Sequence, residues 1–343
     1  MKKGYTFDDY QLVPQYSEVL SRNDVDLSTK LTNDITLDIP IVASPMDTVC
    51  EWKMASTLMD LGGIGCIHRF MDMEQRVEQV EKTMTEGKTY TDGNRWVMVA
   101  VGVGDYELSC GKFLIDKFEG ENIILLIDVA HGHHILVERA IKQLKDYSPS
   151  TPIIGGNICT PEGAEDLQKW GVDGLRIGIG GGSLCTTRIQ TGHGIPNATS
   201  LRDIWKSSSV PLITDGGIRT SGDISKAISM GSDTVMLGSL LSGTEESPAQ
   251  IIETPKGLMK RYRGSASLDT KLSHNQETRN IEGESTLVPY KGGVKYTIQR
   301  LMEGLKSSLS YSGCETIPQF QRNSRLIRIS EAAKTEAKPH LLS

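Results

Sequence analysis

The chain has 343 residues and a formal net charge of −6, with 38% hydrophobic and 23% charged residues. This composition fits a globular protein with room for a large core. The acidic balance argues against a general nucleic-acid or membrane-surface binder, because such proteins usually carry a basic stripe.

Eight short, β-branched segments alternate with amphipathic stretches along the chain. They span residues 39–44, 63–68, 96–101, 123–128, 152–156, 174–179, 211–215 and 234–239. Apolar strands that alternate with helices predict an α/β fold with a parallel sheet. Eight such units favour a (β/α)8 TIM barrel, which needs about 250 residues, over the alternative of an open doubly wound sheet.

The chain after the eighth segment has a different character. Residues 264–295 are polar with little periodicity, which predicts a mobile flap that closes over a site. We expect a helix over roughly 293–310 and a poorly ordered polar tail over roughly 330–343. We interpret residues 1–343 as a single barrel domain.

Several predicted strands end in residues that do not suit a core. These are Ser44 with Pro45, Met46 and Asp47, then His68, Asp128, Asn157, Asp215, and Gly238 with Ser239. Barrel active sites lie at the C-terminal ends of the strands, so we expect these residues to converge on one face.

The segment GIGGGSLCTTR, residues 178–188, combines flexible glycines with a cysteine. Its backbone N–H groups could bind a phosphate or its carbonyls a cation, although an ordinary connecting loop is the alternative. Cys185 lies on this polar loop near Arg188, which would favour the thiolate and a nucleophilic role, although a structural cysteine is the alternative. The six cysteines form no CxxC pair, which argues against zinc. Free thiols, together with the absence of a secretory signal or an apolar run of ~18 residues, predict a cytoplasmic protein.

Two further loops follow predicted strands seven and eight, where barrels often hold phosphates. In DGGIRTSGD, Asp215 could accept from paired ribose hydroxyls, although a capped β–α turn is the alternative. The second loop is MLGSLLSG, residues 236–243. In DVAHGHH, the histidine spacing does not suit a metal site, so Asp128 is the better functional candidate.

In this order along the chain, the motifs resemble the IMP dehydrogenase and GMP reductase family. The resemblance rests on PIVASPMDTV, GGIGCIHRFM, DVAHGHH, GGN, GIGGGSLCTTR, DGGIRTSGD, MLGSLLSGTEESP and YRGSAS, and runs from YTFDDYQLVP to residues 307–313. Gly181 departs from the pattern, because the family usually has proline there. That departure could loosen the loop or weaken a cation site.

The resemblance implies a homotetramer that binds a purine mononucleotide, GMP or IMP. Cys185 would attack C2 of the purine and form a covalent thioimidate, while Asp215 would hold the ribose hydroxyls. The phosphate would be bound by Ser183, Gly217, Gly238, Ser239 and Tyr262. The rest of the nucleotide would contact Ser44, Met46, Asn157, Arg188 and Gly264. Asp128 would face the nicotinamide cofactor, and carbonyls of Gly180, Gly182 and Cys185 would hold potassium.

Three features favour the reductase branch of this resemblance. Only about 27 residues separate His68 from Trp96, too few for the CBS pair that dehydrogenases usually insert there. The flap contains Arg279 but lacks the Arg-Tyr pair with which dehydrogenases activate water. Thr187 and Glu282 match the reductase residues that move protons to the leaving ammonia, with Glu284 as the second choice for the carboxylate.

The resemblance therefore predicts an NADPH-dependent GMP reductase. Other features, PIVASPMDTVCEWKMA and GGIGCIHRFM, look at least as much like a dehydrogenase that lacks the CBS pair and converts IMP to XMP with NAD. A non-catalytic nucleotide sensor is a third hypothesis, but such a module would have little use for Cys185, Thr187 and Glu282 together. A Schiff-base aldolase is disfavoured because no predicted strand ends in lysine.

Overall fold

The computed structural model describes residues 3–91, 93–120, 122–274 and 278–338. Within these residues, eight parallel strands close into a barrel in the order β10-β11-β4-β5-β6-β7-β8-β9. The strands are β4 (Ile41–Ala43), β5 (Ile64–Ile67), β6 (Val97–Val101), β7 (Ile123–Ile127), β8 (Ile153–Ile158), β9 (Gly174–Ile177), β10 (Leu212–Asp215) and β11 (Thr234–Leu237). Each coincides with a predicted segment, although β8 runs two residues beyond the expected end. The prediction of a closed barrel is confirmed.

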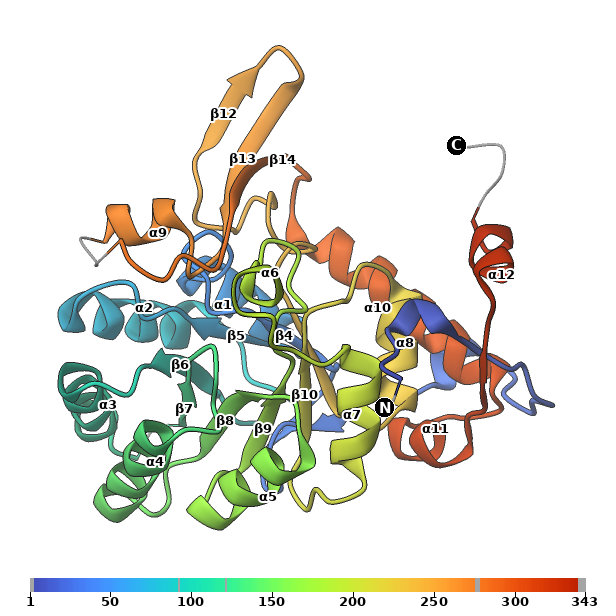
Figure 1. Cartoon of the computed structure of the whole chain (residues 1–343), viewed down its shortest axis with the longest axis horizontal. Coiled ribbons are helices and arrows are strands. Elements are labelled where there is room, and N and C mark those ends of the chain that lie inside the picture. Colours follow the sequence, from blue (N-terminus) through green and yellow to red (C-terminus); the bar gives the residue numbers. More distant parts are fainter. Residues whose placement is uncertain (1–2, 92, 121, 275–277, 339–343) are drawn as a thin grey trace.

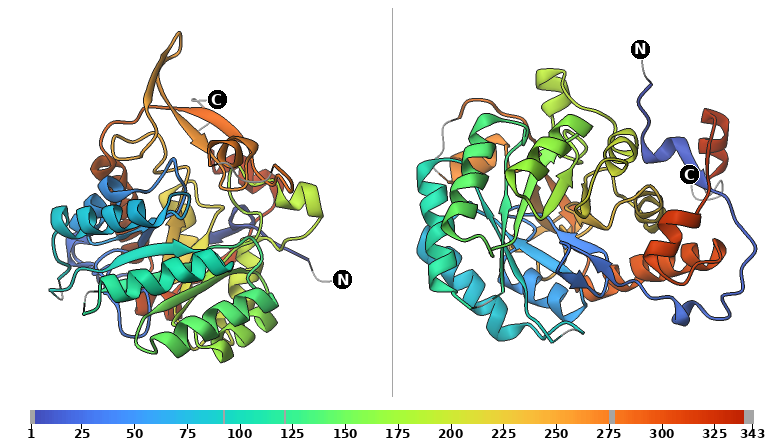
Figure 2. Two further views of the ribbon diagram at one scale, coloured as in Figure 1. Left: turned by 90° about the vertical axis from the view of Figure 1, so that its left-hand side faces the viewer. Right: turned by 90° about the horizontal axis from the view of Figure 1, so that it is seen from below.

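Helices connect the strands and surround the barrel, as Figures 1 and 2 show. They are α1 (Trp52–Asp60), α2 (Met73–Glu86), α3 (Asp105–Lys117), α4 (Ile135–Tyr147), α5 (Pro161–Trp170), α6 (Thr187–Thr191), α7 (Asn197–Trp205) and α8 (Ser221–Ser229). Local sequence sets their ends: Asp72 and Thr220 form capping boxes at α2 and α8. No helix among the described residues is long and apolar enough to cross a bilayer.

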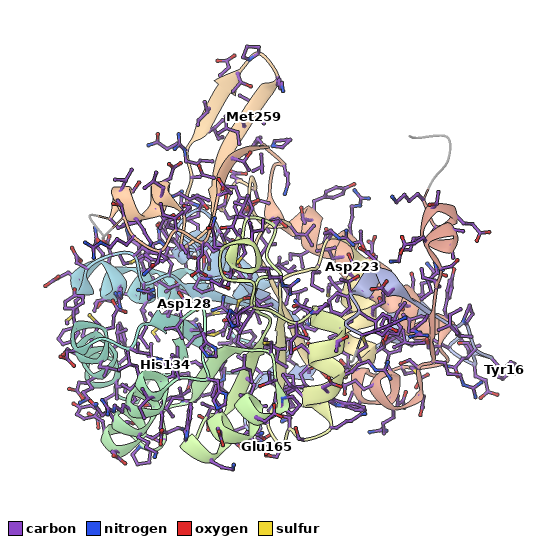
Figure 3. All side chains as sticks on the ribbon, viewed as in Figure 1. Tyr16, Asp128, His134, Glu165, Asp223 and Met259 are labelled. Carbon is purple, nitrogen blue, oxygen red and sulfur yellow. The ribbon has the colours of Figure 1, made fainter. Side chains whose placement is uncertain are left out.

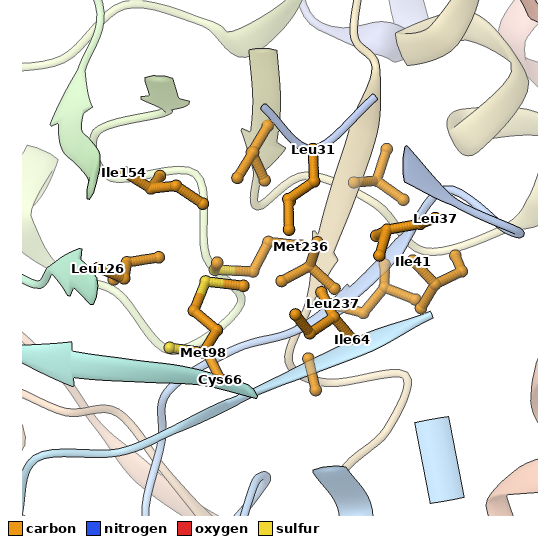
Figure 4. Packing of buried hydrophobic residues seen from close by; sticks show 14 of the residues in the cluster. Leu31, Leu37, Ile41, Ile64, Cys66, Met98, Leu126, Ile154, Met236 and Leu237 are labelled. Atoms are coloured by element: carbon orange, nitrogen blue, oxygen red, sulfur yellow. The ribbon is translucent and has the colours of Figure 1, made fainter. Parts of the chain in front are cut away.

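The core fills the barrel and the space beneath its helices. All five residues of β7 are buried, as a strand covered on both faces requires. Inside the barrel, Met98, Leu126, Ile154 and Met236 gather in Figure 4. A small hairpin of β2 (Thr29–Lys30) and β3 (Thr36–Leu37) lies at the N-terminal strand ends, where the Thr29 hydroxyl donates to the Asp233 carbonyl at 2.8 Å. Leu31, Ile35 and Leu37 of this segment are buried and belong to the core.

A three-stranded sheet projects from the C-terminal end of the barrel (Figure 1). It consists of β12 (Ile251–Thr254), β13 (Gly257–Arg263) and β14 (Ser285–Pro289), and Met259 marks its outer part in Figure 3. Helix α9 (Leu268–Ser273) follows β13. The predicted flap over 264–295 thus contains a helix and a strand that pairs with β13, and its mobility stays a prediction. Residues 275–277 lie outside the described residues.

Helix α10 (Val294–Tyr311) closely matches the helix predicted over 293–310, and it packs against α8 and α1. The chain continues through α11 (Ile317–Asn323), β15 (Leu326–Arg328) and α12 (Glu331–Glu336), and starts with 3-10 helix Phe7–Asp9, β1 (Tyr10–Leu12) and 3-10 helix Arg22–Asp24. Strand β15 pairs with β1, and Lys334 Nζ lies 2.6 Å from Asp9 Oδ1. The tail predicted to be poorly ordered contains α12, which contacts the N-terminal segment through Lys334. Residues 339–343 lie outside the described part.

Candidate active site

A cavity of about 480 Å³ opens at the C-terminal ends of the barrel strands. Its walls include Ser44 after β4, Asp128 after β7, Asn157 in β8 and Asp215 at the end of β10. These positions bring together the polar residues that end the predicted strands. Pro45, Asp47 and His68 are exceptions, because none of them lines this cavity. Asp47 and His68 lie beside a neighbouring cavity, where His68 Nε2 faces Glu51 Oε1 at 3.1 Å.

Cys185 lies on this cavity, on the loop between β9 and α6. Its Sγ is 3.1 Å from the Thr187 hydroxyl oxygen. The Thr187 hydroxyl in turn donates to Glu282 Oε2 at 2.7 Å. A hydroxyl that donates to a carboxylate can still accept from a thiol, so the three side chains form a continuous path for a proton.

The flap segment around Glu282 pairs with the cysteine loop through the backbone. Thr186 N–H donates to the Glu282 carbonyl at 3.0 Å, and Glu284 N–H donates to the Leu184 carbonyl at 2.9 Å. These bonds make Cys185 and Gly283 an antiparallel bridge pair. The pairing fixes the flap carboxylate beside the cysteine, although almost a hundred residues separate them in the sequence.

Cys185 is the exposed cysteine of the six, and all six are free. Burial raises the pKa of the other five thiols, namely Cys50, Cys66, Cys110, Cys159 and Cys314. A raised pKa keeps those thiols protonated and poorly nucleophilic. The geometry therefore distinguishes Cys185 as the candidate nucleophile.

Glycines bring the cysteine loop close to its neighbours. Gly178 has φ +132°, and a Cβ on it would lie 2.2 Å from the Asp215 carbonyl oxygen. Gly180 has φ +74°, and its missing Cβ leaves room for the Arg188 side chain. Arg188 donates to the carbonyls of Ile179 and Ile195 at 3.0 and 2.8 Å. Its guanidinium thus braces this loop and is not among the residues that line the cavity, and its place beside the base and ribose stays a prediction.

Arg176 joins two carboxylates that line the cavity. From β9, its Nη1 lies 2.7 Å from Asp128 Oδ1 and its Nη2 lies 2.9 Å from Asp215 Oδ2. Asn157 Nδ2 donates to the same Asp215 oxygen at 2.8 Å. Burial would lower the pKa of Arg176, but the two carboxylates outweigh it and raise the pKa. The arginine therefore stays charged and holds both carboxylates in position.

The far end of the cavity is suited to a phosphate. The Ser183 and Tyr262 hydroxyl oxygens lie 3.1 Å apart, and burial raises the pKa of Tyr262, which keeps its proton available. Gly217, Gly238 and Ser239 also line the cavity. A Cβ on Gly238 would lie 3.0 Å from the Tyr262 hydroxyl, so glycine lets the tyrosine approach the backbone.

Comparison with known proteins agrees with this geometry. A family model described as the IMP dehydrogenase / GMP reductase domain matches residues 4–340. The chain belongs to this family. GMP reductase of Lactobacillus gasseri is 38% identical over 316 residues, which cover 91% of each chain. IMP dehydrogenase of Cryptosporidium parvum is 36% identical over 385 residues, covering 98% of this chain and 95% of the relative.

The fold agrees with a solved member of the family. A cysteine-to-alanine variant of GMP reductase from Trypanosoma brucei, in complex with guanosine 5′-monophosphate, superposes with a TM-score of 0.91. It is 29% identical in sequence, and the match covers 99% of this chain and 98% of the other. The protein is thus an oxidoreductase of the IMP dehydrogenase/GMP reductase family, whose members use a nicotinamide cofactor.

In the present chain, most of the predicted site residues lie around one cavity. Four further predicted site residues also line this cavity, namely Met46, Gly180, Gly182 and Gly264. Glu284 is exposed and does not line the cavity, so Glu282 is the carboxylate near the cysteine. Of the nearby histidines, His133 pairs with Asp166 at 3.0 Å and His134 caps α4.

Sequence reasoning missed several lining residues. Arg176 is a charged residue inside an otherwise apolar predicted strand, and that signal could have identified it. Arg69 and Phe70 also line the cavity; the Arg69 guanidinium lies 5.0 Å from the Phe70 ring centroid, and its Nε lies 3.4 Å from Asp128 Oδ2. Two further basic residues, Lys271 and Arg219, also line the cavity and were not predicted.

Proposed function

We propose that this protein is a GMP reductase, which converts GMP to IMP and ammonia with NADPH through a covalent thioimidate on Cys185. The hydrogen-bonded series Cys185–Thr187–Glu282, with distances of 3.1 and 2.7 Å, carries the proposal. A nucleophile linked to a carboxyl group through a hydroxyl suits a reaction in which an amine must be protonated before it leaves.

The cavity offers a complementary group for each part of GMP. Ser183, Tyr262 and the turns at Gly217 and Gly238–Ser239 would bind the phosphate dianion. Asp215 would accept from the ribose hydroxyls, with Asn157 and Arg176 holding the carboxylate. Ser44, Met46 and Gly264 would contact the remainder of the nucleotide. The guanosine 5′-monophosphate in the Trypanosoma brucei relative supports this substrate class.

The proposed chemistry takes place at C2 of the purine. Cys185 passes its thiol proton through the Thr187 hydroxyl to Glu282 while its sulfur forms a bond to C2, and Glu282 returns that proton to the 2-amino group. Ammonia then leaves with the electron pair of the C2–N bond. After hydride arrives at C2, the C2–S bond breaks, the sulfur keeps the electron pair, and IMP is released.

The cofactor would lie on the side of the cavity that carries Asp128 and Arg69. Asp128 and the Arg69–Phe70 pair line that side, and they provide a carboxylate, a cation and an aromatic face for a nicotinamide and its amide. When bound, NADPH supplies the hydride. Within the chain, Arg176 keeps Asp128 at a fixed position relative to Asp215, so substrate and cofactor are oriented by one buried guanidinium.

The second candidate function is oxidation of IMP to XMP with NAD. Relatives named IMP dehydrogenase that match nearly the whole chain favour it. Hydrolysis of the covalent intermediate would require an activated water, and residues 264–295 contain no Arg-Tyr pair to provide one. This difference makes the reductase the better-supported proposal.

Other parts of the proposal follow from the family. Carbonyls of Gly180, Gly182 and Cys185 would hold a potassium ion that stabilises the cysteine loop. The chain would act as a single-domain homotetramer, and its six free cysteines suit the reducing cytoplasm. Light scattering of the purified protein tests the oligomeric state.

Parallel assays of the purified protein test the function. One contains GMP with NADPH, the other IMP with NAD, and both products are identified by chromatography. Formation of IMP with consumption of NADPH supports the reductase. Formation of XMP with reduction of NAD would overturn the proposal in favour of the dehydrogenase, and inactivity in both assays would favour the nucleotide sensor.

A further inference from the structure

Asn197 lies between the two loops that carry Cys185 and Asp215. It is the first residue of α7, which packs beside β9 and β10 (Figure 1), and only 5% of its surface is exposed. Its Nδ2 donates to the carbonyls of both Asp215 and Gly216 at 2.8 Å. One amide therefore holds the backbone at the end of β10.

The same side chain occupies the space above Gly181. A Cβ built on Gly181 would lie 2.7 Å from Asn197 Nδ2, 2.9 Å from Oδ1 and 3.1 Å from Cγ. Real side chains do not approach so closely, so any residue other than glycine at position 181 requires Asn197 to move. The proline that resembling sequences carry at this position also has a Cβ and would meet the same obstacle.

The two loops interlock at this point. A Cβ on Gly216, which has φ +84°, would lie 2.6 Å from the Gly181 carbonyl carbon. Gly181 and Gly216 therefore approach each other directly, and Asn197 closes their junction from the side. A shift of the Asn197 amide would move the loop that carries Cys185 relative to Asp215.

Asn197 makes only part of the contacts that its amide allows. Its Oδ1 is buried and has no hydrogen-bond partner among the described residues. An unpaired buried oxygen destabilises the folded state. Stability alone therefore does not explain why an asparagine occupies this position. Its two hydrogen bonds to backbone carbonyls and its fit against Gly181 explain it.

We propose that Asn197 is a positioning residue for the reaction and that positions 181 and 197 form a coupled pair. Asn197 fixes the distance between the cysteine and the ribose-binding carboxylate, and Gly181 is required because Asn197 fills its side-chain space. The proposal rests on the proposed roles of Cys185 and Asp215. It also gives a physical reason for the departure from proline at position 181.

A double-mutant cycle tests this coupling. The variants are Gly181→Ala, Asn197→Ser and the double variant, with Gly222→Ala as control because a Cβ there would meet only Thr220 Oγ1 at 3.6 Å. The readouts are kcat and KM for the nucleotide, the rate of alkylation of Cys185 by iodoacetamide, and the melting temperature. The last two do not depend on which family reaction the protein catalyses, so failure of the proposed function remains distinguishable.

We expect Gly181→Ala to lower kcat by ~10-fold or more and to change the alkylation rate, with a smaller effect on KM. Asn197→Ser should lower kcat without a matching loss in melting temperature. In the double variant, alanine at position 181 should cause little further loss of kcat, because the smaller serine at position 197 leaves space for the alanine Cβ. Additive effects on kcat and alkylation, or wild-type kcat in Asn197→Ser, would overturn the proposal.

Discussion

The Thr187 hydroxyl donates to the Glu282 carboxylate at 2.7 Å, although 95 positions separate the two residues in the chain. Thr187 begins α6 directly after the cysteine loop, whereas Glu282 comes from the flap that precedes β14. The bond exists because residues 282–284 pair with residues 184–186 through their backbones. The flap therefore contributes a side chain to the site as well as a cover.

Replacing Glu282 with glutamine should reduce GMP reduction by ~10²–10⁴-fold, because an amide cannot supply the proton that the leaving amine needs. Affinity for GMP should change little. Rates of ammonia release and nucleotide binding, measured separately, check this expectation. Glu284→Gln is the matched control, since this neighbouring carboxylate is exposed and outside the cavity. If the two variants lose activity equally, Glu282 has no special role.

Cys185→Ala should lower turnover by more than ~10³-fold, because no other cysteine lines the described cavity to form the covalent bond to C2. The variant should still bind GMP, since the phosphate and ribose contacts come from other residues. Calorimetry and activity assays separate the two effects. Cys110→Ala, in the buried face of α3, should keep its activity. Substantial turnover in Cys185→Ala would rule out the covalent route.

Arg176→Met should destabilise the fold by about 3–5 kcal/mol, because two carboxylates would lose their shared buried partner. Arg176→Lys should recover part of the stability but little of the activity, since one ammonium cannot reach Asp128 and Asp215 in the same way. Denaturant unfolding and KM for both substrates provide the measurements. An Arg176→Lys enzyme with normal KM values would show that the bridge is not needed for orientation.

Asp233 makes the stability depend on pH. Burial raises the pKa of its carboxyl from 3.8 to about 6, so the folded state keeps a proton that the unfolded chain loses. The resulting stabilisation is complete below pH 3.8 and is lost as the pH rises through 6, with a total of ~3 kcal/mol at most. Asp233→Asn cannot ionise and should be more stable than the wild type at pH 7.5, with the difference disappearing near pH 4. A pH-independent difference would contradict this assignment.

The fold was largely predictable because its strands are local apolar runs. Segments such as 123–128 must be buried on both faces, and their number limits the sheet to few arrangements. The elements that the sequence did not reveal, α9, β14 and α12, lie in polar segments with little periodicity. For example, α12 depends on Lys334 meeting Asp9, which the local sequence does not reveal.

The candidate site was predictable where one loop carries the chemistry, as around Cys185. It was not predictable where a side chain turns back into the protein. Arg188 follows the cysteine closely but binds the Ile179 and Ile195 carbonyls, while Arg176 in β9 reaches the cavity. The contact between Gly181 and Asn197 likewise arises only once the barrel closes.

Isotope transfer tests the central claim most directly. The wild-type protein would be incubated with GMP and NADPH carrying deuterium at both C4 positions of the nicotinamide, and the product analysed by mass spectrometry. The account predicts IMP with one deuterium at C2 of the purine, released with ammonia. IMP without deuterium, or no IMP while IMP and NAD yield XMP, would contradict it.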